Sequence, residues 1–179
     1  MRAAPHRYEV EGWGVGELWV AGRVVLAHEL PAPPPPGAPA AGSPLGGASA
    51  PTGTLAENPS RRGDAFAADL CRRLRAHLAG RPTSYGDVEL DLTGCTELQR
   101  RLAETLRAVP WGEVVTYGEL AALAGGPGAA RAAGSFCAGN RFALIVPCHR
   151  VVAAEGVGGY GVGGVALKRR LLALEGVAL

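Results

Sequence analysis

The sequence lacks most features of a membrane, secreted or metal-binding protein. No run approaches the ~20 apolar residues of a membrane span, and residues 1–9 contain no apolar signal core, so we expect no secretion. Only four cysteines occur in 179 residues, far apart and never as CxxC. This spacing favours reduced thiols in the cytoplasm over a zinc finger or a disulfide framework.

A strong charge of either sign is also lacking. Eighteen Lys/Arg stand against 16 Asp/Glu, giving a formal net charge of +2, so the whole-chain charge does not indicate nucleic acid. From residue 94 onward there are nine basic and six acidic residues. This small excess permits phosphate contacts, and a mixed solvated surface explains it equally well.

The first half, residues 1–92, is predicted to be a small α/β domain. Alternating and β-branched residues predict strands within 8–30, with Ala21-Gly22 as a hairpin turn. Residues 88–92 alternate apolar and acidic side chains and predict one more strand.

Between those strands, residues 31–63 are rich in Pro, Gly and Ala and have almost no large apolar side chain. We interpret this stretch as a mobile insertion. A helix is predicted from Asp64, as its cap, to about Ala79. Its apolar face is formed by Phe66, Leu70, Leu74 and Leu78.

The second half, residues 93–179, is predicted to be mainly helical. Two capping boxes, Thr96 with Gln99 and Thr116 with Glu119, predict the starts of two helices. Further helices are predicted over 129–138 and 167–175, the former after a glycine-rich turn at 125–128. Two short helices joined by such a turn favour a helix-turn-helix.

The predicted helix over 129–138 has small residues in its first turns, with Arg131 as the one long side chain there. One interpretation is a helix packed tightly against a neighbour. The other is a flat face that approaches the DNA minor groove, with Arg131 projecting into it. The residues alone favour neither.

The segment Pro147-Cys148-His149-Arg150-Val151 follows an apolar run over 142–146. A thiolate is the nucleophilic form of cysteine, and a free thiol titrates at ~8.5, so a reactive cysteine needs a neighbour that takes its proton. His149 is the nearest candidate. A Cys-His pair alone is weak evidence, because most such cysteines are small buried hydrophobes.

Several ordered motifs strengthen this candidate: 112–117, 129–132, Gly139-Asn140, 145–152 and 171–176. Together they resemble the O6-alkylguanine-DNA alkyltransferases (methylated-DNA–protein-cysteine methyltransferases). The resemblance implies a ribonuclease H-like α/β N-terminal domain and a mainly α C-terminal domain with a winged helix-turn-helix-like motif.

The resemblance also implies a role for each matching residue. Cys148 would accept the alkyl group, His149 would act as its base through a water, and Glu175 would orient His149. Asn140 would hold the turn that presents Cys148.

On the DNA side, Tyr117 would donate to guanine N3 and contact a phosphate, and Arg131 would replace the extruded nucleotide. The remaining DNA contacts implied are Thr116, Ala129, Ala130, Ala132 and Gly134. The pocket residues implied are Pro147, Val151, Tyr160, Gly161 and Lys168.

The implied activity is repair of O6-alkylguanine, with O4-alkylthymine as a second substrate, by irreversible transfer to Cys148. Because a thioether is stable, each molecule would act once. The expected partner is alkylated double-stranded DNA, the expected state a monomer, and neither a cofactor nor a metal is expected. Two departures from the family pattern are Arg141, in the usual place of proline, and Gly161, in the usual place of serine.

Three alternatives remain at this point. A non-catalytic alkyltransferase-like lesion binder would replace the acceptor cysteine, which this chain retains. A cysteine hydrolase would seldom place its base directly after the nucleophile. A regulatory helix-turn-helix protein with a redox cysteine would need polar base-reading side chains where this chain has alanines.

Overall fold

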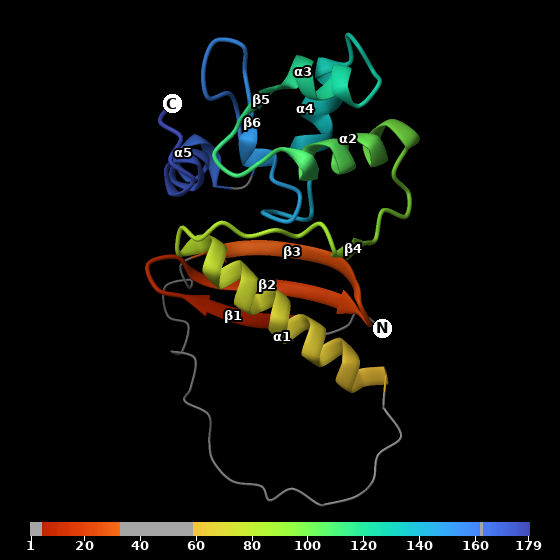
Figure 1. Ribbon diagram of the computed structural model, residues 1–179, viewed down its shortest axis with the longest axis vertical. Helices are drawn as coiled ribbons and strands as arrows, with labels where there is room; N and C mark the ends of the chain where they lie inside the picture. Colours follow the sequence, from red (N-terminus) through yellow and green to blue (C-terminus); the bar gives the residue numbers. More distant parts are fainter. Residues whose placement is uncertain (1–4, 33–58, 162) are drawn as a thin grey trace, which may run out of the picture.

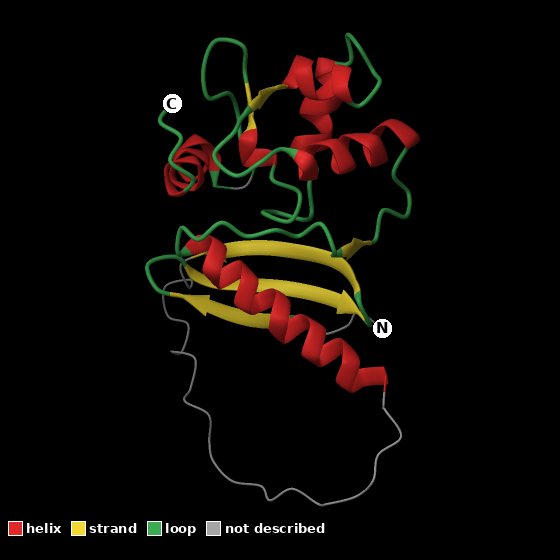
Figure 2. Cartoon of the chain, viewed as in Figure 1, coloured by secondary structure: helices red, strands yellow, loops and turns green. Residues whose placement is uncertain are grey.

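The computed structural model describes residues 5–32, 59–161 and 163–179. A sheet with one long helix across it forms one part, and shorter helices gather beyond the β3 side of the sheet (Figure 1). The same view coloured by secondary structure shows that the long strands belong to the first part, whereas helices and loops dominate the second (Figure 2). The protein is therefore a mixed α/β structure.

The sheet is built from β1 (His6–Val10), β2 (Gly14–Ala21), β3 (Val24–Ala32) and β4 (Glu89–Leu90), in that order. β1, β2 and β3 are antiparallel neighbours, and β4 pairs with β3 in parallel. The predicted hairpin is confirmed with a shift of one residue, because Ala21 pairs with Val24 and the turn is Gly22-Arg23. Gly22 has φ +61°, a backbone conformation that glycine adopts at little cost.

Helix α1 (Pro59–Leu78) packs its predicted apolar face on the sheet. The helix begins five residues earlier than predicted, so Asp64 lies inside it and is not its cap. Proline is tolerated in the first turn, where its missing N–H would have no helical partner. The prediction of an insertion over 31–63 is corrected at both ends, since β3 continues to Ala32 and α1 starts at Pro59; the rest lies outside the described residues.

The second part contains α2 (Glu97–Ala108), α3 (Tyr117–Leu123), α4 (Ala130–Ala138) and α5 (Gly164–Leu174). Both predicted capping boxes are present, at Thr96 and at Thr116. α5 begins three residues earlier than predicted. A short 3₁₀ turn, η1 (Cys148–Arg150), precedes β6 (Val151–Val152), which pairs in parallel with β5 (Val115–Thr116). The sequence did not predict this two-stranded sheet.

The two parts are joined through backbone and side-chain contacts. The His28 backbone N–H donates to the Arg141 carbonyl at 2.8 Å, and His28 forms an isolated parallel bridge with Phe142. Farther along the interface, the Arg170 guanidinium lies 3.6 Å from the centre of the Trp13 ring and donates to the Gly12 carbonyl at 2.7 Å. The segment that leads to Cys148 is therefore attached to β3.

His28 is buried and fully bonded. Its Nε2 lies 2.6 Å from the Tyr8 hydroxyl and its Nδ1 lies 2.5 Å from the Ala143 carbonyl, so Nδ1 carries the proton and Tyr8 donates. Gly16 makes room for the Tyr8 ring, because a Cβ at that position would lie 2.4 Å from Tyr8 Cζ. Within the described residues, we find no helix that is both long and apolar enough to cross a bilayer.

Candidate active site

The segment before Cys148 is a bent, buried loop. Residues 142–146 were predicted to be an apolar run, and all except Ala143 are buried. The run does not form a strand, since Leu144 has φ +66°, which a non-glycine residue rarely adopts. After this bend the loop continues into η1, which begins at Cys148.

Asn140 braces this loop with its side chain. Its amide nitrogen donates to the Val146 carbonyl at 2.8 Å and to Cys148 Sγ at 3.1 Å, and its amide oxygen accepts from the Phe142 N–H at 3.0 Å. One side chain therefore contacts the start and the end of the loop and the sulfur that the loop presents.

Cys148 is 7% exposed and lines a cavity of about 280 Å³. Burial raises the pKa of its thiol, while hydrogen bonds from Asn140 and Tyr160 and the charge of Lys168 act in the opposite direction. The thiol therefore needs a base before it can react. The other residues lining the cavity are Tyr117, Gly134, Cys137, Ala138, Gly159, Tyr160 and Gly161.

His149 and Glu175 form a buried pair, with His149 Nε2 and Glu175 Oε1 2.8 Å apart. A carboxylate only accepts hydrogen bonds, so Nε2 carries the proton and Nδ1 has a free lone pair. Nδ1 is buried and has no hydrogen-bond partner among the described residues. Burial lowers the pKa of His149 to about 4, despite the opposing effect of Glu175. His149 is therefore neutral at pH 7 and able to accept a proton at Nδ1.

Glu175 is surrounded by donors. Arg150 donates to both carboxylate oxygens, each at 2.9 Å, and the Gly112 N–H donates to Oε2 at 3.2 Å. Nε2 of His77 lies 3.3 Å from Oε1. Burial alone would raise the pKa of Glu175, but hydrogen bonds from His149, His77 and Arg150 outweigh it and hold that pKa well below its ordinary value.

The ligand atoms of His77, His149 and Glu175 lie within 4.8 Å of one another, so their spacing would suit a metal ion. The Arg150 guanidinium already occupies both carboxylate oxygens. A cation at this position would lie beside that positive charge in a buried environment, which is costly.

The cavity wall differs in part from the predicted pocket. Tyr160 and Gly161 line the cavity as predicted, whereas Pro147, Val151 and Lys168 do not. Val151 is paired in β6 with its side chain in the core. Lys168 is buried and donates to the carbonyls of Val151 and Gly159, so it ties the cavity loop to β6.

Among the predicted DNA contacts, Arg131 and Ala132 are exposed on the outer face of α4. Ala129, Ala130 and Gly134 are partly buried. Thr116 uses its hydroxyl to cap α3, where it bonds Glu119. Tyr117 is half-buried and lies on the cavity wall. Ala133 packs in the core, as the packing interpretation of this helix expects, while Arg131 faces solvent and is accessible to a partner.

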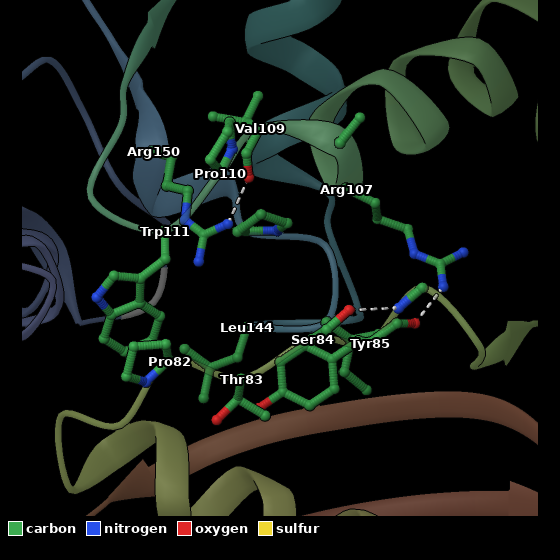
Figure 3. A pocket seen from close by; sticks show the side chains of 14 residues that line it. Pro82, Thr83, Ser84, Tyr85, Arg107, Val109, Pro110, Trp111, Leu144 and Arg150 are labelled. Carbon is green, nitrogen blue, oxygen red and sulfur yellow. Dashed lines mark hydrogen bonds between the residues drawn. The ribbon is translucent and has the colours of Figure 1, made fainter.

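A second cavity, of about 430 Å³, lies beside the loop that precedes Cys148 and is lined by residues of both parts of the chain (Figure 3). Arg150 crosses its wall and donates to the Val109 carbonyl at 2.7 Å. Arg107 holds the opposite wall by donating to the carbonyls of Tyr85 and Val88. Pro147 faces this cavity rather than the one that contains Cys148.

Arg141 stands where the family pattern usually has proline. In the structure its guanidinium donates to the Asp91 carbonyl and lies 3.4 Å from the Asp91 carboxylate. It also stacks over Phe142, 5.1 Å from the ring centre. Arg141 therefore attaches the loop that precedes Cys148 to the segment that follows β4.

Several site residues gave no clear signal in the sequence. Arg150 could have been suspected, because a charged residue inside an apolar segment needs a buried partner. Cys137 has no distinguishing context in the sequence, and the cavity alone shows that it lies on the same wall as Cys148. His77 and Gly112 meet Glu175 only through the tertiary fold.

Comparisons with known proteins agree with these features. Residues 97–177 match the family model described as 6-O-methylguanine DNA methyltransferase, DNA binding domain. The chain is 48% identical over 120 residues to the methylated-DNA–protein-cysteine methyltransferase of Mycolicibacterium paratuberculosis, a match that covers 66% of this chain and 68% of that protein. It is 43% identical over 110 residues to the protein of the same name from Methanothermobacter thermautotrophicus, covering 62% and 61%.

Solved structures extend the similarity over both parts of the chain. Mycobacterium tuberculosis OGT in complex with DNA is 35% identical, has a TM-score of 0.69 and matches 97% of this chain and 93% of that one. The O6-methylguanine-DNA methyltransferase of Pyrococcus kodakaraensis is 25% identical, with a TM-score of 0.54 and coverage of 97% and 99%.

Proposed function

Because the chain belongs to the family of methylated-DNA–protein-cysteine methyltransferases, whose activity is direct reversal of DNA alkylation, we propose that Cys148 is its acceptor. The observation that carries this assignment is the position of Cys148. Its sulfur lines the cavity, and it directly precedes His149, whose unpartnered Nδ1 is backed by Glu175.

Cys137 lines the same cavity and is the competing acceptor. Burial and the neighbouring Cys148 raise the pKa of Cys137 to about 12. Asn140 and Tyr160 place hydrogen-bond donors on the Cys148 sulfur, which stabilise a thiolate. Cys148 is therefore the better nucleophile of the two.

In the proposed reaction, the Cys148 thiol gives its proton to His149 Nδ1 through a bridging water. The sulfur then attacks the alkyl carbon as the bond from that carbon to guanine O6 breaks, and the bond's electrons leave on the guanine. Glu175 stabilises the imidazolium that forms at His149. The guanine leaves as an anion and takes up the proton from the His149 imidazolium through water, so the products are a thioether, neutral His149 and an unmodified guanine. No step regenerates the thiol, so one molecule repairs one lesion.

For DNA, the exposed face of α4 is the proposed contact. Arg131 and Ala132 would enter the minor groove, with Arg131 filling the place of the flipped nucleotide. Tyr117, on the cavity wall, would donate to guanine N3 and contact the adjacent phosphate. The pair α3–α4 would then act as part of a winged helix-turn-helix-like motif, and residues 1–92 as a ribonuclease H-like domain.

We also keep four further predictions as part of this proposal: O4-alkylthymine as a second substrate, alkylated duplex DNA as the target, a monomeric state and a cytoplasmic location. The alternative of a non-catalytic lesion binder is disfavoured by the retention of Cys148, His149 and Glu175 together in one buried arrangement.

The test is intact-mass spectrometry after incubation with a duplex that contains one O6-methylguanine, followed by peptide mapping. We expect a gain of one methyl group per protein, located on Cys148, and no gain in Cys148→Ala, which should still bind the duplex. Methylation of Cys137 in the wild type would refute the assignment. Lesion-selective binding without any mass gain would support the lesion-binder alternative.

A further inference from the structure

His77 lies in the last turn of α1, outside the segment 97–177 that matches the family model. Its side chain is 1% exposed. The ring stacks on Tyr85, with centres 5.8 Å apart and planes 20° apart, and it packs against Trp111 at 4.8 Å. Aromatic contacts on two sides therefore fix the orientation of the imidazole.

This orientation points His77 at the same carboxylate oxygen that binds His149. Nε2 of His77 lies 3.3 Å from Oε1 of Glu175 as a polar contact without hydrogen-bond geometry, whereas Nε2 of His149 is hydrogen-bonded to that atom at 2.8 Å. The rings of the two histidines meet edge to face, with centres 6.0 Å apart. A residue of the first half of the chain thus takes part in the buried cluster that serves the acceptor.

The contacts assign the tautomer of His77. Since a carboxylate can only accept, the proton of neutral His77 belongs on Nε2, which faces Glu175. Nδ1 is then an acceptor, and the Tyr85 hydroxyl lies 3.2 Å from it and can donate. The Tyr85 hydroxyl is therefore hydrogen-bonded to His77, whose opposite nitrogen faces Glu175 at 3.3 Å.

We propose that His77 is a positioning residue for alkyl transfer: its Nε2–H, oriented by Tyr85, makes a polar contact of 3.3 Å that helps to keep the Glu175 oxygen in the place from which that oxygen orients His149. The inference rests on the proposed function, with His149 as the base for Cys148. His77 does not touch the reacting atoms and acts through Glu175 alone.

The charges around His77 suit a neutral donor. The groups that face it are Glu175, Arg150, His149 and the Tyr85 hydroxyl. Burial lowers the pKa of His77, Glu175 raises it and Arg150 lowers it further, with a net lowering. A neutral His77 supports Glu175 without placing a second cation beside the imidazolium that forms on His149 during transfer.

The experiment compares His77→Phe, which keeps a ring but removes both nitrogens, with His77→Gln, whose amide nitrogen can replace Nε2–H. Leu74→Val is the matched control, because Leu74 is fully buried one turn earlier on α1 and is not among the donors to Glu175. Each protein is mixed in excess with a duplex that contains one O6-methylguanine. The single-turnover transfer rate is measured across a range of pH, and duplex affinity is measured separately.

We expect His77→Phe to slow transfer up to about threefold, the lower end of the value of one hydrogen bond, with an unchanged duplex Kd. With one donor fewer, the Glu175 charge should stabilise the His149 imidazolium more strongly and so raise the pKa of His149. The acidic limb of the pH–rate profile should therefore move to higher pH. His77→Gln should restore most of the rate and return the limb toward the wild-type position. Leu74→Val should change neither.

If His77→Phe does not fold, Tyr85→Phe provides a milder test, since it removes only the hydroxyl that orients His77 and should shift rate and profile in the same direction. The inference would be overturned if His77→Phe showed the wild-type rate and pH profile. If that variant does not fold, the same result in Tyr85→Phe would overturn it. So would equal slowing of the Phe, Gln and Leu74→Val variants, which would indicate packing alone. Failure of the proposed function is a separate result, because the wild type would then gain no methyl group on Cys148.

Discussion

The cluster around Glu175 and the outer face of α4 belong to the same half of the chain but hold their side chains in opposite ways. In the cluster, His149 and Arg150 are buried and each is hydrogen-bonded to the buried Glu175. On α4, Arg131 is exposed to solvent. In the proposed function, the folded protein would position the chemistry before DNA arrives, whereas the α4 face would act only through contact with DNA.

The largest expected effect tests the buried side of this comparison. Glu175→Gln removes the charge that orients His149 and leaves the Arg150 guanidinium buried without a counter-charge. We expect the single-turnover transfer rate to fall by roughly 10²- to 10⁴-fold, as when the acid of a catalytic triad is made neutral. The free energy of unfolding should fall by about 3–5 kcal/mol.

Glu155→Gln is the control, because Glu155 is an exposed glutamate in the same half of the chain. Transfer kinetics and urea denaturation are measured on both variants. A Glu175→Gln protein with wild-type rate and stability would show that the buried cluster is not organised around this carboxylate.

Arg131→Ala tests the exposed side. We expect transfer from duplex DNA to slow about tenfold, since the flipped nucleotide loses its replacement in the stack. The reaction with free O6-benzylguanine should stay unchanged, and so should the free energy of unfolding, within about 0.5 kcal/mol. Arg169→Ala, an exposed arginine on α5, is the control. Equal slowing on both substrates would contradict a role in base flipping.

A final prediction concerns the pH dependence of stability and again separates the two regions. Burial lowers the pKa values of His28 and His149 to about 4 from 6.5, so the unfolded chain binds more protons than the native state between these values. Stability is therefore present above pH 6.5 and is lost as pH falls toward 4, by up to about 1.4 kcal/mol per histidine for each unit of pKa difference.

Urea denaturation at about pH 7.5, 6 and 5 measures this loss. Arg131→Ala should show the same pH dependence as the wild type, because Arg131 belongs to the exposed face. An unfolding free energy that stays constant from pH 7.5 to 5 would show that the two histidines do not remain neutral in the native state.

Local sequence signals predicted the parts of the fold that short-range chemistry determines. Thr96 and Thr116 begin helices because each is followed three residues later by a side chain that completes a capping box. The start of α1 was predicted wrongly because Asp64 is a favourable cap, while Pro59 is equally compatible with a first helical turn.

The candidate site was predictable to the extent that its residues lie close together in the sequence. Asn140, Cys148 and His149 fall within ten residues and were singled out together. Lys168 was assigned to the pocket, yet it bonds backbone carbonyls beside the cavity. Neither that placement nor the approach of His77 to Glu175 follows from spacing, because both depend on how distant segments pack.

The contacts of Arg170 with Trp13 and Gly12 limit which halves of related proteins can be combined in one chain. Arg170 lies inside the segment that matches the family model, and its partners lie at the other end of the chain. The fit between the two halves therefore depends on residues from both. A chimera that joined this second half to the first half of a distant relative would need compatible residues at the positions of Gly12 and Trp13, however similar the two second halves were.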